Sequence, residues 1–229
     1  MNTQKTILAL AVAAAVAIPA YGIPDGPYTA NYGTIGSQQT VDFSTTLSVP
    51  KFNTVGGTRT LDSVSFTLSG GSAAGQSVIN TGSSTATFVL TTTVSITLLD
   101  PLGGTVVTTI PTVQNTALNL GAGLSRDFGT TAGSDSDLVT YTSNLGQFTG
   151  AGNVVLPLFS VTSTGAAGGG GNNTPNFTTT AFANISVTYN YSNVETPVPE
   201  PRVYGAIGAV ACLGLLGYRR LRARQAAQA

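Results

Sequence analysis

The stretch ATFVLTTTVSITL, residues 86–98, alternates between two kinds of side chain along its whole length. In an extended chain every second side chain points the same way. The row on one face consists of Ala86, Phe88, Leu90, Thr92, Val94, Ile96 and Leu98. At about 3.3 Å per residue such a strand spans about 43 Å, long enough to bend or to pass between two sheets. The stretch therefore predicts a long β-strand with one buried face.

The same alternation predicts further strands on both sides of this one. Asp100-Pro101 and Gly103-Gly104 form a turn signal, so residues 105–110 are expected to return as a hairpin. Other alternating segments lie at residues 41–49, 64–68, 138–141, 154–161 and 181–191. In the last of these, Ala183, Ile185, Val187, Tyr189 and Tyr191 share one face. The Gly-rich residues 165–171 are expected to form a flexible loop between two strands.

These segments define the fold class. Residues 40–191 contain no amphipathic helical period of usable length. Many strands joined by polar turns are typical of an all-β protein. We predict an antiparallel β-sandwich over residues 23–191, with a jelly-roll and an Ig-like arrangement both open.

The composition of this body fits an exported β-protein. Ser and Thr make up roughly a quarter of the chain, and charged residues only 8%. Residues 23–197 contain eight acidic and three basic side chains, a net charge of −5. A sparse acidic surface cannot attract a phosphate backbone, so nucleic acid is excluded as a partner.

The first 22 residues are typical of a signal peptide. Lys5 supplies the positive charge, residues 7–18 are an apolar helix-forming segment, and small residues follow. Ala20 and Gly22 mark a small-x-small cleavage site, with a cut after Ala20 as the competing position. Twelve apolar residues are too few to span a membrane, so we expect a removable signal helix.

The other end of the chain has three parts in a fixed order. After a linker at residues 192–198 come Pro199, Glu200 and Pro201, whose prolines favour an extended, accessible backbone. Residues 203–218 form an apolar run, predicted to be a single transmembrane helix of about 24 Å. The basic residues after it are Arg219, Arg220, Arg222 and Arg224. Such a cluster keeps its end in the cytoplasm and places the body outside.

Residues 199–224 resemble a PEP-CTERM sorting signal of Gram-negative bacteria, through the Pro-Glu-Pro motif, the Gly-, Ala- and Leu-rich helix and the terminal arginines. This resemblance implies that an exosortase recognises Pro199, Glu200 and Pro201. It also implies that the inner membrane holds the protein transiently, before its release to the cell surface. A plain C-terminal membrane anchor is the alternative.

The body is similar to the choice-of-anchor E domains over most of residues 38–191. The similarity lies in Leu47–Asn53, in Leu61–Gly70 and in the closing Val187–Tyr191. It implies a bacterial surface β-domain with no settled biochemical activity.

The sequence offers little catalytic chemistry. It contains no histidine, which excludes Ser-His-Asp catalysis and His-based metal sites, and its one cysteine, Cys212, lies in the apolar tail. Asp135 and Asp137 are the one close acidic pair, expected in a solvated loop and a weak candidate for Ca²⁺. We expect no enzyme activity, no cofactor and no metal.

We therefore predict an exported, non-enzymatic β-sandwich protein of the envelope, extracellular matrix or biofilm. The alternative is a polysaccharide-binding module, with or without Ca²⁺, on a plain membrane anchor, and exopolysaccharide is a candidate partner in either case. Glycan contact needs exposed aromatic rings. Tyr28, Tyr32 and Tyr141, which lie outside the clearest core faces, are the candidates.

Overall fold

The computed structural model describes residues 22–34, 37–194, 208–215 and 218. The chain divides into two compact units, Met1–Ser192 and Asn193–Ala229. The predicted signal helix with Ala20, the Pro199-Glu200-Pro201 motif and Arg219, Arg220, Arg222 and Arg224 lie outside the described residues. Gly22 is exposed and directly precedes the first strand.

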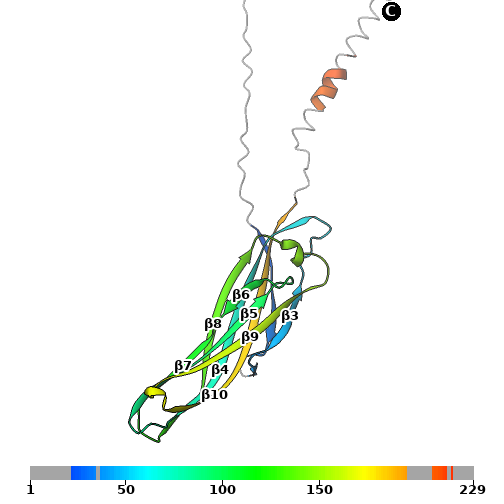
Figure 1. Cartoon of the computed structure of the whole chain (residues 1–229). Coiled ribbons are helices and arrows are strands. Elements are labelled where there is room, and N and C mark those ends of the chain that lie inside the picture. Colours follow the sequence, from blue (N-terminus) through cyan, green and yellow to red (C-terminus); the bar gives the residue numbers. More distant parts are fainter. Residues whose placement is uncertain (1–21, 35–36, 195–207, 216–217, 219–229) are drawn as a thin grey trace, which may run out of the picture. The chain divides into compact units, whose positions relative to one another are not determined.

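Ten strands and two short 3-10 helices make up the described part of the first unit (Figure 1). In chain order they are β1 (Ile23–Tyr32), β2 (Gln39–Thr40), β3 (Ser44–Pro50), β4 (Arg59–Asn80), β5 (Ala86–Leu99), β6 (Thr105–Thr109), β7 (Thr112–Leu120), β8 (Ser125–Tyr141), η1 (Leu145–Phe148), β9 (Asn153–Gly168), η2 (Gly169–Gly171) and β10 (Asn173–Asn193).

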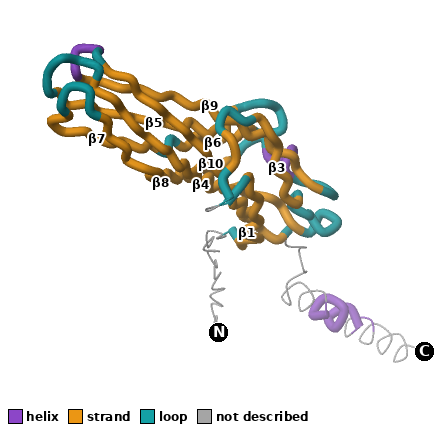
Figure 2. Tube along the Cα trace, turned by 90° about the horizontal axis from the view of Figure 1, so that it is seen from below, coloured by secondary structure: helices purple, strands orange, loops and turns teal. Residues whose placement is uncertain are grey.

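The strands form two sheets that face each other as a β-sandwich, which confirms the predicted fold class (Figure 2). Sheet 1 has the order β1-β10-β4-β8, with β2 also paired to β10. Sheet 2 has the order β3-β9-β5-β6, with β7 also paired to β5. If β6 and β7 count as one interrupted strand, the chain stays in the same sheet at two connections, from β1 to β2 and from β5 to this strand, and changes sheet at every other connection. This order is that of a jelly roll and not that of an Ig domain.

The main hydrophobic core lies between the inner faces of the two sheets. The row of β5 from Phe88 to Leu98 is buried, as the alternation predicted, and its Val94, Ile96 and Leu98 belong to this core. The predicted row on β10 from Ala183 to Tyr191 is buried as well. Tyr189 is wholly buried, and its hydroxyl donates a 2.7 Å hydrogen bond to the Pro50 carbonyl.

A buried polar layer separates this core from a smaller cluster around Val78, Phe88 and Leu90. Gln76 Nε2 donates to Thr92 Oγ1 at 2.9 Å, and Asn115 Nδ2 donates to Gln76 Oε1 at 2.9 Å. Both amides thereby gain partners that replace water. Thr92 interrupts the apolar row of β5 for this reason.

One side of the sandwich is closed by contacts between β8 and the interrupted strand β6–β7. Tyr141 Oη donates to the Thr105 carbonyl at 3.1 Å, and the Ile110 N–H donates to Asp135 Oδ2 at 2.7 Å. Between these bonds and the tip, a Cβ on Gly133 would lie 2.6 Å from the Thr112 carbonyl oxygen. The close approach of the two edges therefore requires glycine at this position.

Several elements differ from the sequence predictions. β4, β8 and β10 are much longer than expected, and β1 and β7 were not predicted. The expected loop at residues 165–171 is instead the end of β9 followed by η2. These segments are rich in Gly, Ser and Thr, and they become strands because paired neighbours complete their backbone hydrogen bonds.

In the second unit, residues 208–215 and 218 are helical. Among the described residues, none of the helices combines the length and the apolar character that a membrane crossing needs.

Candidate functional site

The outer face of sheet 1 is covered with short hydroxyl and amide side chains. Cross-strand hydrogen bonds join Ser65 to Thr140 and Ser69 to Ser136, each at 3.0 Å. Asn190 Nδ2 donates to Ser63 Oγ at 3.1 Å nearer the end of the sheet where β10 finishes. These groups offer donors and acceptors without charge, so the face can bind uncharged polar ligands.

Phe182 is an aromatic side chain on this outer face. Its neighbours Ala181 and Ala183 are buried, so the alternation of β10 directs Phe182 outward, where it is half-buried. Its ring covers Gly71 of β4 so closely that a Cβ on Gly71 would overlap ring atoms. A Cβ on Gly33 would lie 3.3 Å from the Phe182 Cβ. Glycines on two sides therefore let the ring lie close against the sheet.

A hollow of about 290 Å³ lies beside this ring, lined by Asn31, Gly33, Thr34, Phe182 and Asn184. Asn31 of β1 and Asn184 of β10 stand directly opposite each other in the strand register, and both side chains are exposed. Opposed residues of an antiparallel pair lie side by side, with Cβ atoms about 5 Å apart. The two amides therefore lie side by side, two positions along the strands from the Phe182 ring and in the same hollow.

A second, more polar hollow of about 250 Å³ lies further along the same face. Its lining includes Ser77 of β4, Asp127 and Thr130 of β8, and Asn176 and Thr178 of β10. The register of β4 and β8 shifts between Gly75 and Ser77, and Gly129 has a positive φ of 64° at this irregularity. A β-bulge therefore shapes this hollow.

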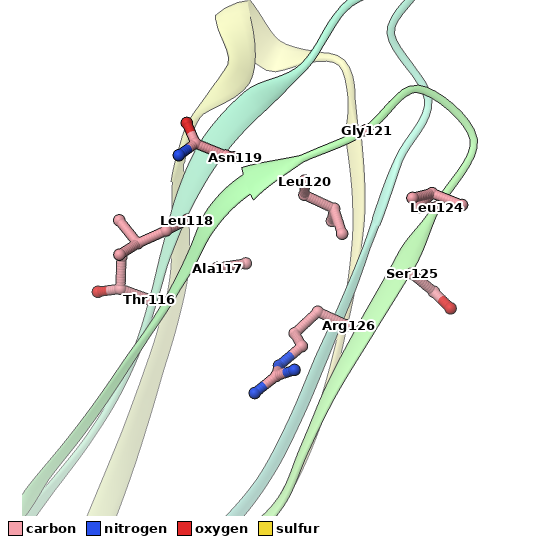
Figure 3. Close-up of a pocket in the computed structure, with 9 residues that line it drawn as sticks. All are labelled: Thr116, Ala117, Leu118, Asn119, Leu120, Gly121, Leu124, Ser125 and Arg126. Atoms are coloured by element: carbon pink, nitrogen blue, oxygen red, sulfur yellow. The ribbon is translucent and has the colours of Figure 1, made fainter.

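A third hollow, of about 410 Å³, lies at the tip between the end of β7 and the start of β8 (Figure 3). Ala117 and Leu120 project from β7 toward Arg126, whereas Thr116 and Leu118 project to the other side. The Arg126 guanidinium carbon lies 5.6 Å from the Phe128 ring centroid. This hollow thus combines leucines with one cation, whereas the hollow beside Phe182 is lined by uncharged residues only.

Asn80 organises the loops around the tip. Its buried Nδ2 donates to the carbonyls of Ser84 and Leu120, both at 2.8 Å, and its Oδ1 accepts from the Gly82 N–H at 2.9 Å. One side chain therefore ties the turn after β4 to the loop after β7.

The structure places the predicted acidic pair on strand β8, so the prediction of a loop was wrong. Asp135 accepts the backbone N–H groups of Ile110 and Ser136, and Asp137 accepts that of Leu138. Within the described ranges no three His, Cys, Asp or Glu side chains come together as a metal site would require.

The three tyrosines proposed for glycan contact pack against the core instead. The hydroxyl of Tyr28 donates to Asp25 Oδ1 at 2.7 Å, and this hydrogen bond, with burial, raises its pKa. Burial followed by the charge of Asp100 raises the pKa of Tyr141. Tyr28 and Tyr141 are thus held by structural contacts that favour the protonated phenol. Their prediction as exposed sugar platforms was wrong.

Sequence reasoning missed Phe182, although the signal was present. The row predicted to be buried on β10 comprises Ala183, Ile185, Val187, Tyr189 and Tyr191. Phe182 is out of phase with this row and is therefore directed to the opposite face. The other outward side chains of β10 are mostly Asn, Ser and Thr. An aromatic residue among them was the signal that could have identified this surface.

No family model matches the chain, and no curated protein matches it either. Solved structures give low similarity. A chain of the infectious bursal disease virus Gx strain is 14% identical with a TM-score of 0.24, and the match covers 90% of this chain and 55% of the viral chain. Eiger TNF from S. frugiperda is 9% identical (TM-score 0.23, 76% of this chain and 99% of that chain). The C-terminal CBM6 of LamC from Zobellia galactanivorans is 12% identical (TM-score 0.19, 73% and 93%). These scores assign neither family nor function.

Proposed function

We propose that this is an exported, non-enzymatic jelly-roll protein that a PEP-CTERM tag directs to the cell surface, where it is a component of the envelope or extracellular matrix. The order of Pro199-Glu200-Pro201, the apolar run 203–218 and the terminal arginines is the observation that carries the proposal. An exosortase-type enzyme is the implied processing partner.

The geometry of the body supports this role. Ile23 at the start of β1 pairs with Tyr191 near the end of β10, so the chain enters and leaves the sandwich at one end. The loops organised by Asn80 lie at the other end (Figure 1). β4 alone has 22 residues and extends up to about 70 Å at 3.3 Å per residue. A tag after β10 would leave both sheet faces and the tip available for matrix partners.

Mass spectrometry of the protein from a Gram-negative host that encodes an exosortase tests the proposal. The wild-type chain should end near residue 201 and be found at the cell surface. Replacing Pro199, Glu200 and Pro201 by alanine should leave the chain intact to Ala229 in the inner membrane, whereas alanine at the linker residue Thr196 should change nothing. An intact Ala229 in the wild-type chain, in the same host, would favour the plain anchor.

A further inference from the structure

The Phe182 ring is presented in a fixed way on the outer face of sheet 1. Gly71 lies beneath the ring and Gly33 adjoins its Cβ, so the ring is pressed onto the sheet. An aromatic ring supplies a large rigid contact area and loses little side-chain entropy on binding. The sugar ring is a natural partner for such a platform, because one face of a pyranose consists of C–H groups.

The polar groups around the ring can hydrogen-bond to the hydroxyl groups of a sugar. Asn31 and Asn184 each carry two N–H donors and one carbonyl acceptor, and they stand opposite each other beside the ring. Sugar hydroxyls both donate and accept hydrogen bonds, so each can pair with either end of an amide. Thr34 adds a hydroxyl to the same hollow.

We propose that the outer face of sheet 1 binds a neutral polysaccharide chain, with Phe182 stacking on one sugar ring and Asn31 and Asn184 hydrogen-bonding to its hydroxyls. The inference rests on the proposed function, because it names the matrix partner of the exported body. The residues that line the hollow carry no charge, which favours a neutral glycan over a uronate- or sulfate-bearing one. A single half-buried ring offers too little apolar area for a stable protein interface.

The same row of β10 extends the surface along the strand. Asn176 and Thr178 point to the same face as Phe182 and line the second polar hollow together with Asp127, whose negative charge would repel an acidic polymer. Six residues at about 3.3 Å each place Asn176 about 20 Å from Phe182. The hydroxyl and amide row between them suits several consecutive sugars of an extended chain better than one monosaccharide.

Affinity electrophoresis of the full-length chain in a mild detergent tests the inference. The native gels contain hydroxyethyl cellulose, galactomannan or dextran as neutral polymers, and alginate as the acidic one. We expect at least one neutral polymer to retard the wild-type chain. Phe182→Ala should weaken this binding by about tenfold or more, as expected for an aromatic residue at the centre of a contact. Phe182→Tyr should retain binding because it keeps the ring.

Phe159→Ala is the matched control, since Phe159 is a half-buried aromatic residue on the outer face of sheet 2. It should bind like the wild-type chain. Asn184→Ala should weaken binding without touching any aromatic ring, and circular dichroism should show that every variant is folded. Three results would overturn the inference: no retardation by any of the three neutral polymers, unchanged binding by folded Phe182→Ala, or retention on alginate alone that Arg126→Ala abolishes.

The electrophoresis separates this inference from the proposed function. A chain that binds a neutral polymer but keeps Ala229 in its host would overturn the sorting proposal alone. A chain that is processed and reaches the surface but is not retarded would overturn the glycan inference alone.

Discussion

Because the phenol of Tyr189 is buried, we expect the sandwich to lose stability at alkaline pH. Its ring packs against Tyr28 and Phe52 at centroid distances of 5.8 and 5.9 Å, and no part of it is exposed. Burial, followed by the neighbouring Tyr28 and Asp25, raises the pKa of Tyr189 well above its ordinary value of 10.0. In the unfolded chain the phenol titrates at about 10.

The sign of the effect follows from these two pKa values. Below the unfolded pKa both states hold the proton and the stabilising contribution is fully present. Above it the unfolded chain releases the proton while the folded chain keeps it, so stability falls as the pH rises toward the folded pKa. One such group costs about 1.4 kcal/mol of unfolding free energy per pH unit in this window.

Tyr189→Phe removes both the titration and the hydrogen bond to Pro50. At about pH 8 the variant should be less stable by about 1 kcal/mol, the net value of one such bond. Between about pH 8 and pH 11 the wild-type chain should lose about 1.4 kcal/mol more than the variant, so the two stability curves should cross between about pH 10 and pH 11. Urea unfolding followed by far-UV circular dichroism measures both curves. Tyr32→Phe is the matched control, and parallel curves for wild type and Tyr189→Phe would refute the reasoning.

Three other substitutions test particular contacts by the same urea unfolding. Asn80→Ala should lower the free energy of unfolding by about 2–4 kcal/mol, because three hydrogen bonds at the tip lose their partner. The control Thr116→Ala, at an exposed position, should lower it by less than about 0.5 kcal/mol. Equal effects of the two substitutions would contradict the role assigned to Asn80. Thr109→Val should stabilise by about 1 kcal/mol, since its buried hydroxyl has no hydrogen-bond partner in the described part of the chain, and a loss of stability would show that this hydroxyl is satisfied. Gly71→Val should destabilise by about 1–3 kcal/mol because its side chain would overlap the Phe182 ring, and pairing it with Phe182→Ala should recover part of that loss.

The inward rows were predictable because alternation is a local property of the sequence. Residues 86–98 specified the buried face of β5, and residues 183–191 that of β10. The Asp100–Gly104 turn was predictable for the same reason, and Asp100 Oδ1 accepts the N–H groups of Leu102 and Gly104 as an Asx turn requires. Local turn chemistry therefore identified the β5–β6 hairpin.

Strand lengths were not predictable in this way. Residues 69–75 of β4 are Ser, Gly and Ala, which have low strand propensity, yet they lie in the middle of a 22-residue strand. β8 and β10 flank β4 on both sides and complete its backbone hydrogen bonds. The choice between a jelly roll and an Ig domain depended on such long-range pairing, and alternation alone says nothing about which strands are neighbours.

The glycines of β4 link this problem to the candidate glycan site. Gly70 faces inward, where a Cβ would lie 2.6 Å from Thr109 Oγ1 and 2.8 Å from Ile96 Cδ1 of sheet 2. Gly71 faces outward, where a Cβ would meet the ring of Phe182. Adjacent residues of a strand point to opposite faces, so one Gly-Gly pair allows both the close approach of the sheets and the seating of the aromatic ring. A Gly-Gly pair in the centre of a strand weakens that strand by about 1–2 kcal/mol relative to alanine. The approach of sheet 2 therefore accounts for Gly70, and the ring of Phe182 accounts for Gly71.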